Sequence, residues 1–100
     1  PEPELFDTIR EVGTDPLTGQ AACLRELGRY DEAEDRLREV LRRIPAEPTA
    51  HLELARLEMA RGHPDEARLA VDNALLAWAD ADPGFRPAAE ARALREALAD

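Results

Sequence analysis

Apolar side chains recur at spacings of three and four residues along the middle of the chain, and glycine or proline bounds each stretch. This spacing places apolar side chains on one face of a helix. Gly28 and Gly62 suit the left-handed position that ends a helix, and Pro45 and Pro48 are expected to stop the helix before them. The pattern predicts four central helices, over residues 16–27, 30–44, 49–61 and 64–79.

Two further helices are expected at the ends of the chain. Residues 3–12 carry Leu5, Phe6, Ile9 and Val12 at helical spacing, and residues 87–99 mix alanine and leucine with charged side chains. The segment D-A-D-P-G-F-R-P that precedes the last helix is interpreted as a loop, because proline and glycine disfavour regular structure.

The four central helices form two copies of one pattern, shifted by 34 residues. From Ala21 to Ala33 the chain reads A-A-C-L-R-E-L-G-R-Y-D-E-A, and from Ala55 to Ala67 it reads A-R-L-E-M-A-R-G-H-P-D-E-A. A repeat of this length is typical of stacked helix pairs rather than of a single closed core.

The repeated pattern resembles the tetratricopeptide repeat, a unit of two antiparallel helices in about 34 residues. That family places a small residue in the first helix, glycine at the turn and alanine early in the second helix. The matching pairs here are Ala21 and Ala55, Gly28 and Gly62, and Ala33 and Ala67, and the closing proline of the first copy is Pro45. The large aromatic residue of the family is replaced by Leu17 in one copy and by His51 in the other.

The resemblance implies an all-α stack of two helix hairpins, one formed by residues 14–47 and one by residues 48–81. Residues 1–13 and 82–100 then supply an N-terminal and a C-terminal capping helix. The alternative for the first is the tail of a truncated repeat, and the second lies where the first helix of a third repeat would be. A chain that begins with Pro1 rather than methionine is expected to be an excerpt of a longer protein.

Composition narrows the classes of partner. The net charge of −9 argues against nucleic acid and against anionic membrane surfaces. The chain has no apolar run long enough to span a membrane and no recognisable signal peptide, and its single cysteine favours a reducing compartment. A cytoplasmic location is therefore expected. Many of the apolar residues are alanine, so the core should consist of close, small-residue helix contacts.

Charged side chains are expected mainly on the outside of the helices. Three glutamate–arginine pairs have the favoured spacing of four residues: Glu32–Arg36, Glu34–Arg38 and Glu39–Arg43. The other carboxylates are also expected on exposed helix faces beside arginines, and they are interpreted as a solvated surface.

No group of residues predicts catalysis. His51 and His63 are twelve residues apart, with one in a helix and one in a turn, which does not match a helical metal site or a zinc finger. His51 is expected to be a partly buried packing residue, and His63 to help begin a helix. Cys23 is expected to be a small buried packing residue. We therefore expect a protein that is not an enzyme and that has no catalytic, metal or cofactor site.

The resemblance implies instead a scaffold that binds an extended peptide on the concave face of the stack. The groove positions of the family correspond to Thr18, Ala22, Arg25, Thr49, Leu52, Arg56 and Met59, with Asp15, Arg86 and Glu90 at the margins. Arginine suits bidentate binding of a carboxylate, so the expected protein or peptide partner carries one. The alternative for Arg25 and Arg56 is local pairing with Glu26, with Glu53 or with a neighbouring helix.

A second class of function is self-association. Exposed ends of a repeat stack can bind other copies and give dimers or open arrays. Trp78 and Phe85 flank the last predicted loop and are candidates for such a patch, while packing beneath the terminal helix is the competing interpretation.

Overall fold

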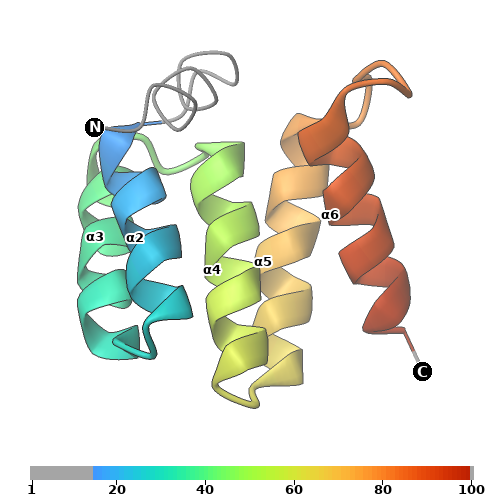
Figure 1. Ribbon diagram of the computed structural model, residues 1–100. Helices are drawn as coiled ribbons and strands as arrows, with labels where there is room; N and C mark the ends of the chain where they lie inside the picture. Colours follow the sequence, from blue (N-terminus) through green and yellow to red (C-terminus); the bar gives the residue numbers. More distant parts are fainter. Residues whose placement is uncertain (1–14, 100) are drawn as a thin grey trace.

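The computed structural model describes residues 15–99, and within this range the chain forms five helices and no strand. The helices are α2 (Pro16–Glu26), α3 (Tyr30–Arg43), α4 (Pro48–Ala60), α5 (Pro64–Ala77) and α6 (Arg86–Ala97). Successive helices run in opposite directions, and the stack extends from α2 and α3 at one side to α6 at the other (Figure 1). The predicted all-α helical-repeat stack is confirmed, and the helix expected over residues 3–12 lies outside the described residues.

Glycine ends the first helix of each hairpin, as the sequence predicts. Gly28 has a φ of +78° and Gly62 a φ of +80°, in the left-handed region. The N–H of Gly28 donates to the carbonyl oxygen of Arg25 at 3.0 Å, and the N–H of Arg29 donates to that of Leu24 at 2.8 Å. The same two bonds form at the second turn. Each turn therefore satisfies carbonyls that the helix end leaves without a partner.

Carboxylates cap the first helix of each hairpin. The side chains of Asp15 and Glu47 each accept a hydrogen bond from the backbone N–H two residues later, at 2.8 Å and 2.9 Å. Helix α3 ends at Arg43, before Pro45, but Pro48 does not act as a helix stop, because it is the first residue of α4. Proline is compatible with that position because the first N–H groups of a helix have no partner within it.

Alanine allows the helices to approach closely. Ala21, Ala33, Ala55 and Ala67 have no exposed surface, which confirms the expected small-residue contacts. Because the methyl side chain of alanine is small, the two helix backbones can approach closely. Larger side chains on either side of the contact can then interdigitate at the density of a protein interior.

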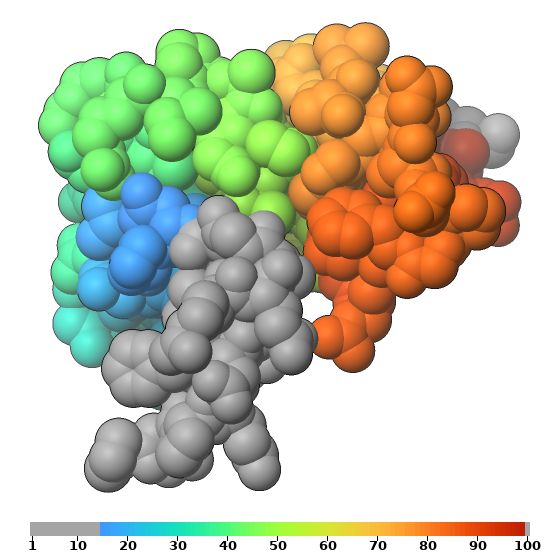
Figure 2. All heavy atoms as spheres, turned by 90° about the horizontal axis from the view of Figure 1, so that it is seen from above, coloured from blue at the N-terminus to red at the C-terminus, as the bar shows by residue number. Residues whose placement is uncertain are grey.

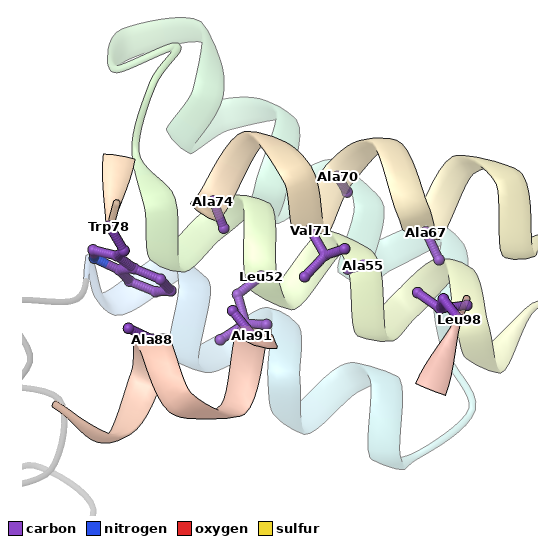
Figure 3. Packing of buried hydrophobic residues seen from close by; sticks show 10 residues of the cluster. All are labelled: Leu52, Ala55, Ala67, Ala70, Val71, Ala74, Trp78, Ala88, Ala91 and Leu98. Carbon is purple, nitrogen blue, oxygen red and sulfur yellow. The ribbon is translucent and has the colours of Figure 1, made fainter. Parts of the chain in front are cut away.

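Buried apolar side chains form two clusters, and α4 contributes to both. The first cluster joins α2, α3 and α4 through Ala21, Ala33, Leu37, Val40, Ala50 and Leu57. The second cluster joins α4, α5 and α6 through Leu52, Ala55, Ala67, Ala70, Val71, Ala74, Trp78, Ala88, Ala91 and Leu98 (Figure 3). Leu54 packs against both clusters. Helix α4 of the second hairpin therefore joins the two clusters, so the two hairpins do not form separate cores.

Trp78 lies at the end of the second cluster, next to the start of α6. Its ring meets the ring of Phe85 edge to face, with centroids 5.6 Å apart and an interplanar angle of 75°. Figure 3 shows the indole beside Ala88. Trp78 is buried and Phe85 partly buried, so these residues pack beneath the last helix and do not form an exposed aromatic patch.

Cys23 is exposed, so the prediction that it is buried was wrong. Its counterpart 34 residues later is Leu57, which is fully buried in the first cluster beside α3. In the described part of the chain, α2 has no preceding helix to cover the corresponding face. The exposure of Cys23 thus follows from its place in the stack rather than from its place in the repeat.

The surface pairs of α3 agree with the sequence in part. Two predicted pairs are formed, Glu34–Arg38 and Glu39–Arg43. The third is replaced, because Glu32 accepts two bonds from Arg29 in the preceding turn, at 2.5 Å and 2.7 Å. Arg36 instead donates to the side-chain oxygen of Gln20 in α2, at 3.1 Å. Partners across the turn and across the hairpin thus compete with partners on the same helix.

An ion cluster connects α3 to the end of α4. Arg61 donates to Glu34 at 2.8 Å and to Asp31 at 2.9 Å. The hydrogen bond from Arg61, supported by Arg38, lowers the pKa of Glu34 below its ordinary value, and the bond with Glu34 raises the pKa of Arg61. The ionised carboxylate is therefore favoured in the folded protein.

The turn glycines are testable by substitution. Gly28→Val and Gly62→Val should each lower the free energy of unfolding by more than about 1 kcal/mol, because left-handed backbone is strained for a β-branched residue. A Cβ atom at either position meets no atom within 4 Å, so the effect isolates backbone strain. The control is Gly84→Val, at an open position outside the left-handed region. Equal denaturation midpoints for all three variants would contradict this account of the turns.

The ion cluster predicts a dependence of stability on pH. Because the pKa of Glu34 is lowered in the folded state, its contribution is fully present above the ordinary value of 4.5 and is lost as the pH falls through the lowered value. The difference in free energy of unfolding between wild type and Glu34→Gln should therefore shrink below this pH. Glu96→Gln, at an exposed position that makes no ion pair within residues 15–99, is the control. A difference in free energy of unfolding between wild type and Glu34→Gln that stays constant with pH would contradict the prediction.

Candidate interaction surface

The predicted groove residues lie on α2 and α4, which pack against each other. From the front and from above, α2 and α6 lie on one side of the stack and α3 and α5 on the other (Figures 1 and 2). The first helices of the repeat pattern therefore line one face, and α6 continues that face beyond α4.

The groove residues differ strongly in exposure. Thr18 and Leu52 are buried, and Leu52 belongs to the second cluster. Ala22, Thr49 and the two predicted arginines are partly exposed, and Met59 is exposed. The hydroxyl of Thr18 is buried without a hydrogen-bond partner among the residues that the structure describes. Among the predicted groove residues, the large side chains that a partner could contact are thus mainly Arg25, Arg56 and Met59.

A buried carboxylate holds the two predicted arginines together. Glu53 in α4 is only 2% exposed. Its Oε2 accepts a hydrogen bond from Nε of Arg25 in α2, and its Oε1 accepts one from Nη1 of Arg56 at 3.4 Å. A carboxylate at this depth needs charged donors to offset the loss of water. Glu53 therefore fixes the positions of both guanidinium groups and connects α2 with α4.

The network continues into α6. Nη2 of Arg56 donates to Oε1 of Glu90 at 2.7 Å, and Glu90 occupies the same repeat position as Arg56, 34 residues later. We call Arg25, Glu53, Arg56 and Glu90 the arginine–glutamate chain. It crosses the three helices of this face, so the local pairing that was the alternative for the arginines is present. Each guanidinium has five N–H donors, and these contacts do not occupy all of them.

The sequence named Glu53 as a candidate partner of the arginines but did not predict that it is buried. The expectation that the carboxylates form a solvated surface is wrong at this position, because α2 and α4 enclose the side chain. The only local signal is Arg56, three residues later. Arg25 is distant in sequence, and the repeat aligns Glu53 with Gly19, so no recurring pattern marks the position.

The two histidines have separate surroundings. His51 is partly buried, as predicted, and its Nε2 lies 2.8 Å from the carbonyl oxygen of Pro45. Nδ1 of His63 lies 2.8 Å from Oε1 of Glu58, and the imidazole forms no capping bond to α5. Within residues 15–99, no three histidine, cysteine or acidic side chains are grouped as metal ligands would be, and no helix has the length and hydropathy needed to cross a membrane.

Removal of the Glu53 charge tests its structural role. Glu53→Gln keeps the shape of the side chain but leaves two guanidinium groups without their shared counter-charge, and it should lower the free energy of unfolding by about 1–3 kcal/mol. The control is Glu26→Gln, because Glu26 is an exposed neighbour of Arg25. The triple variant Arg25→Gln/Glu53→Gln/Arg56→Gln should recover part of the loss, since no buried charge is then left without a partner. Identical urea denaturation of the two single variants would show that the carboxylate is not needed there.

The fold and the comparison with known families agree. The family model described as the tetratricopeptide repeat matches residues 24–98, which include the end of α2 and all of α3 to α6. Comparisons with curated proteins and with solved structures give no significant match. Proteins of this family generally mediate protein–protein interaction as scaffolds rather than as enzymes. Because the match spans most of the described residues, the chain belongs to the tetratricopeptide repeat family.

Proposed function

We propose that this domain binds an extended partner segment that carries a carboxylate, on the face formed by α2, α4 and α6. The observation that supports the proposal is the arginine–glutamate chain, in which a buried carboxylate orders two partly exposed arginines. The family supports a general role in protein interaction, and the arginine–glutamate chain supports a partner that carries a carboxylate.

The arginines are already ordered before a partner arrives. Glu53 engages Nε of Arg25 and Nη1 of Arg56, so both side chains lose rotamer freedom during folding rather than during binding. Preorganisation of this kind lowers the entropy cost of association. The fork of N–H groups that remains on a guanidinium matches the two oxygens of a carboxylate.

Exposed carboxylates occupy the outer sides of both arginines. Glu26 lies 3.9 Å from Nη2 of Arg25, and Glu90 accepts a bond from Nη2 of Arg56. Exposed ion pairs of this kind contribute little to stability. A partner carboxylate can therefore replace Glu26 or Glu90 without disturbing the buried Glu53.

An apolar contact lies one helical turn from Arg56 on α4. Met59 follows Arg56 by three residues and is 41% exposed, and its flexible thioether can adapt to different side chains. Leu52 and Thr18 remain part of the proposal as packing residues beneath the groove, because both are buried. Ala22 and Thr49 are partly exposed at the margins. The expected partner therefore has a carboxylate with an apolar side chain close to it.

The test selects ligands from a displayed peptide library and compares them on two proteins. Peptides that bind wild type should contain aspartate, glutamate or a free C-terminus, and their affinity should fall as salt is added. The triple variant Arg25→Gln/Glu53→Gln/Arg56→Gln should bind them at least about tenfold more weakly, the loss expected from two charged hydrogen bonds. This variant is preferable to reversing the two arginines, because reversal would surround the buried Glu53 with like charge.

A charge-matched control separates the site from general electrostatics. Arg38→Gln/Glu39→Gln/Arg42→Gln changes the same residue types on α3, and the bonds of Arg38 and Arg42 stay within α3 rather than reaching α2. It should retain wild-type affinity, and circular dichroism should show that both triple variants are helical. Carboxylate peptides that bind both triple variants as tightly as wild type would place the site elsewhere.

A further inference from the structure

Two leucines stand on the outer face of α5 where the other repeat carries charges. Leu69 is 65% exposed and Leu76 is 78% exposed, and their spacing of seven residues places them on the same side of the helix. The positions 34 residues earlier, on α3, are Asp35 and Arg42, which are also exposed. Single exposed leucines are common, but two leucines in place of two charged residues give α5 an apolar contact surface that α3 lacks.

A further repeat in the same stack would not cover these leucines. Helices α3 and α5 are successive second helices, and they make at most marginal contact with each other, whereas each packs closely on its hairpin partner and α3 also packs on α4. A third repeat would add one more helix after α6. In the same geometry, that helix would lie beside α5 in the way that α5 lies beside α3, with at most marginal contact. The leucines would then remain exposed on the outer face of the stack.

An apolar pocket lies on the surface where the two repeats meet. A cavity of about 350 Å³ lies between α3 and α4. Leu37, Leu41 and Leu54 supply its apolar lining, and Arg38 and Arg42 stand at its rim with Glu34 and Glu58. Leu37 is almost completely buried and the other two leucines are partly buried, so the pocket opens directly onto the core of the first repeat.

The charges around the pocket and around the leucines are complementary. The side chains of Arg38 and Arg42 are 74% and 71% exposed. The two glutamates of the pocket are much less exposed and are engaged by Arg61 and His63. The pocket therefore presents mainly positive charge to solvent.

The leucines, by contrast, have acidic neighbours. Asp72 lies between them in sequence, and Asp65 precedes Leu69 by one helical turn, with exposed side chains. Their ion pairs with Arg68 and Arg95, and those of the pocket arginines within α3, lie at the surface and contribute little stability. These pairs can therefore be exchanged for contacts between molecules.

We propose that the outer face of α5 binds the α3–α4 pocket of a second copy of this chain. Leu69 and Leu76 enter the apolar pocket, and Asp72 faces the arginines of its rim. Because the two surfaces differ, the contact is heterologous, and each bound molecule keeps one unused pocket or one unused leucine face. We therefore expect association to produce rings or open chains of molecules rather than closed dimers. This contact leaves the face of α2, α4 and α6 accessible and does not depend on its proposed ligand.

Two variants that each lack one surface test the contact by sedimentation velocity. Leu69→Ser/Leu76→Ser removes the leucines, and Arg38→Glu/Arg42→Glu reverses the rim of the pocket. The weight-average mass of wild type should rise beyond that of a dimer with concentration and fall with added salt. Each variant alone should sediment as a monomer. An equimolar mixture should form a dimer and nothing larger, because it contains one intact pocket and one intact leucine face per pair.

Matched controls remove the same residue types elsewhere. Leu27→Ser changes an exposed leucine at the end of α2, and Arg92→Glu reverses an exposed arginine on α6, so both should associate like wild type. Circular dichroism checks folding, and Arg38→Gln/Arg42→Gln replaces the reversed variant if that one is not helical. A wild type that stays monomeric at all concentrations, variants that still associate alone, or a mixture without a dimer would each overturn the proposal.

Discussion

Close contact between helices at alanine is the constraint on which the rest of this structure depends. Ala21 and Ala33 in one hairpin and Ala55 and Ala67 in the other have no exposed surface. A larger side chain at these points would separate the helices and disturb the packing around them. Because each hairpin is narrow, α4 can contact α3 on one side and α5 on the other, and it contributes to both buried clusters.

The packing of α4 against its neighbours also explains the arginine–glutamate chain. Since α2 and α4 pack together, a glutamate on α4 is enclosed by its neighbours and can meet an arginine from each helix. Glu53 thus couples the geometry of the stack to the positions of Arg25 and Arg56. The outer side has a different character, because α3 carries charges where α5 carries Leu69 and Leu76. One small domain can in this way present two chemically distinct surfaces.

Features that depend on local sequence were predictable, and features that depend on neighbouring elements were not. The helices follow from periodicity, and the turns at Gly28 and Gly62 follow from the need for left-handed backbone. The burial of Cys23 was predicted wrongly because its counterpart Leu57 has a helix packed over it and Cys23 has none among the described residues. Pairing of the arginines with Glu53 was one of the alternatives, but the burial of Glu53 was not predicted, because Arg25 and α2 enclose it only after the two hairpins have packed.

Hydrogen exchange of backbone amides, measured by NMR under native conditions with increasing denaturant, tests most directly whether α4 unites the two repeats. If α4 unites the two clusters by packing in both, the slowest amides of α3, α4 and α5 should exchange through one opening reaction. The free energy of that reaction should equal the free energy of global unfolding. Slow amides of α3 that open at a clearly lower free energy than those of α4 and α5 would contradict this account. The two hairpins would then unfold independently, and the common core would not hold the arginine–glutamate chain in place.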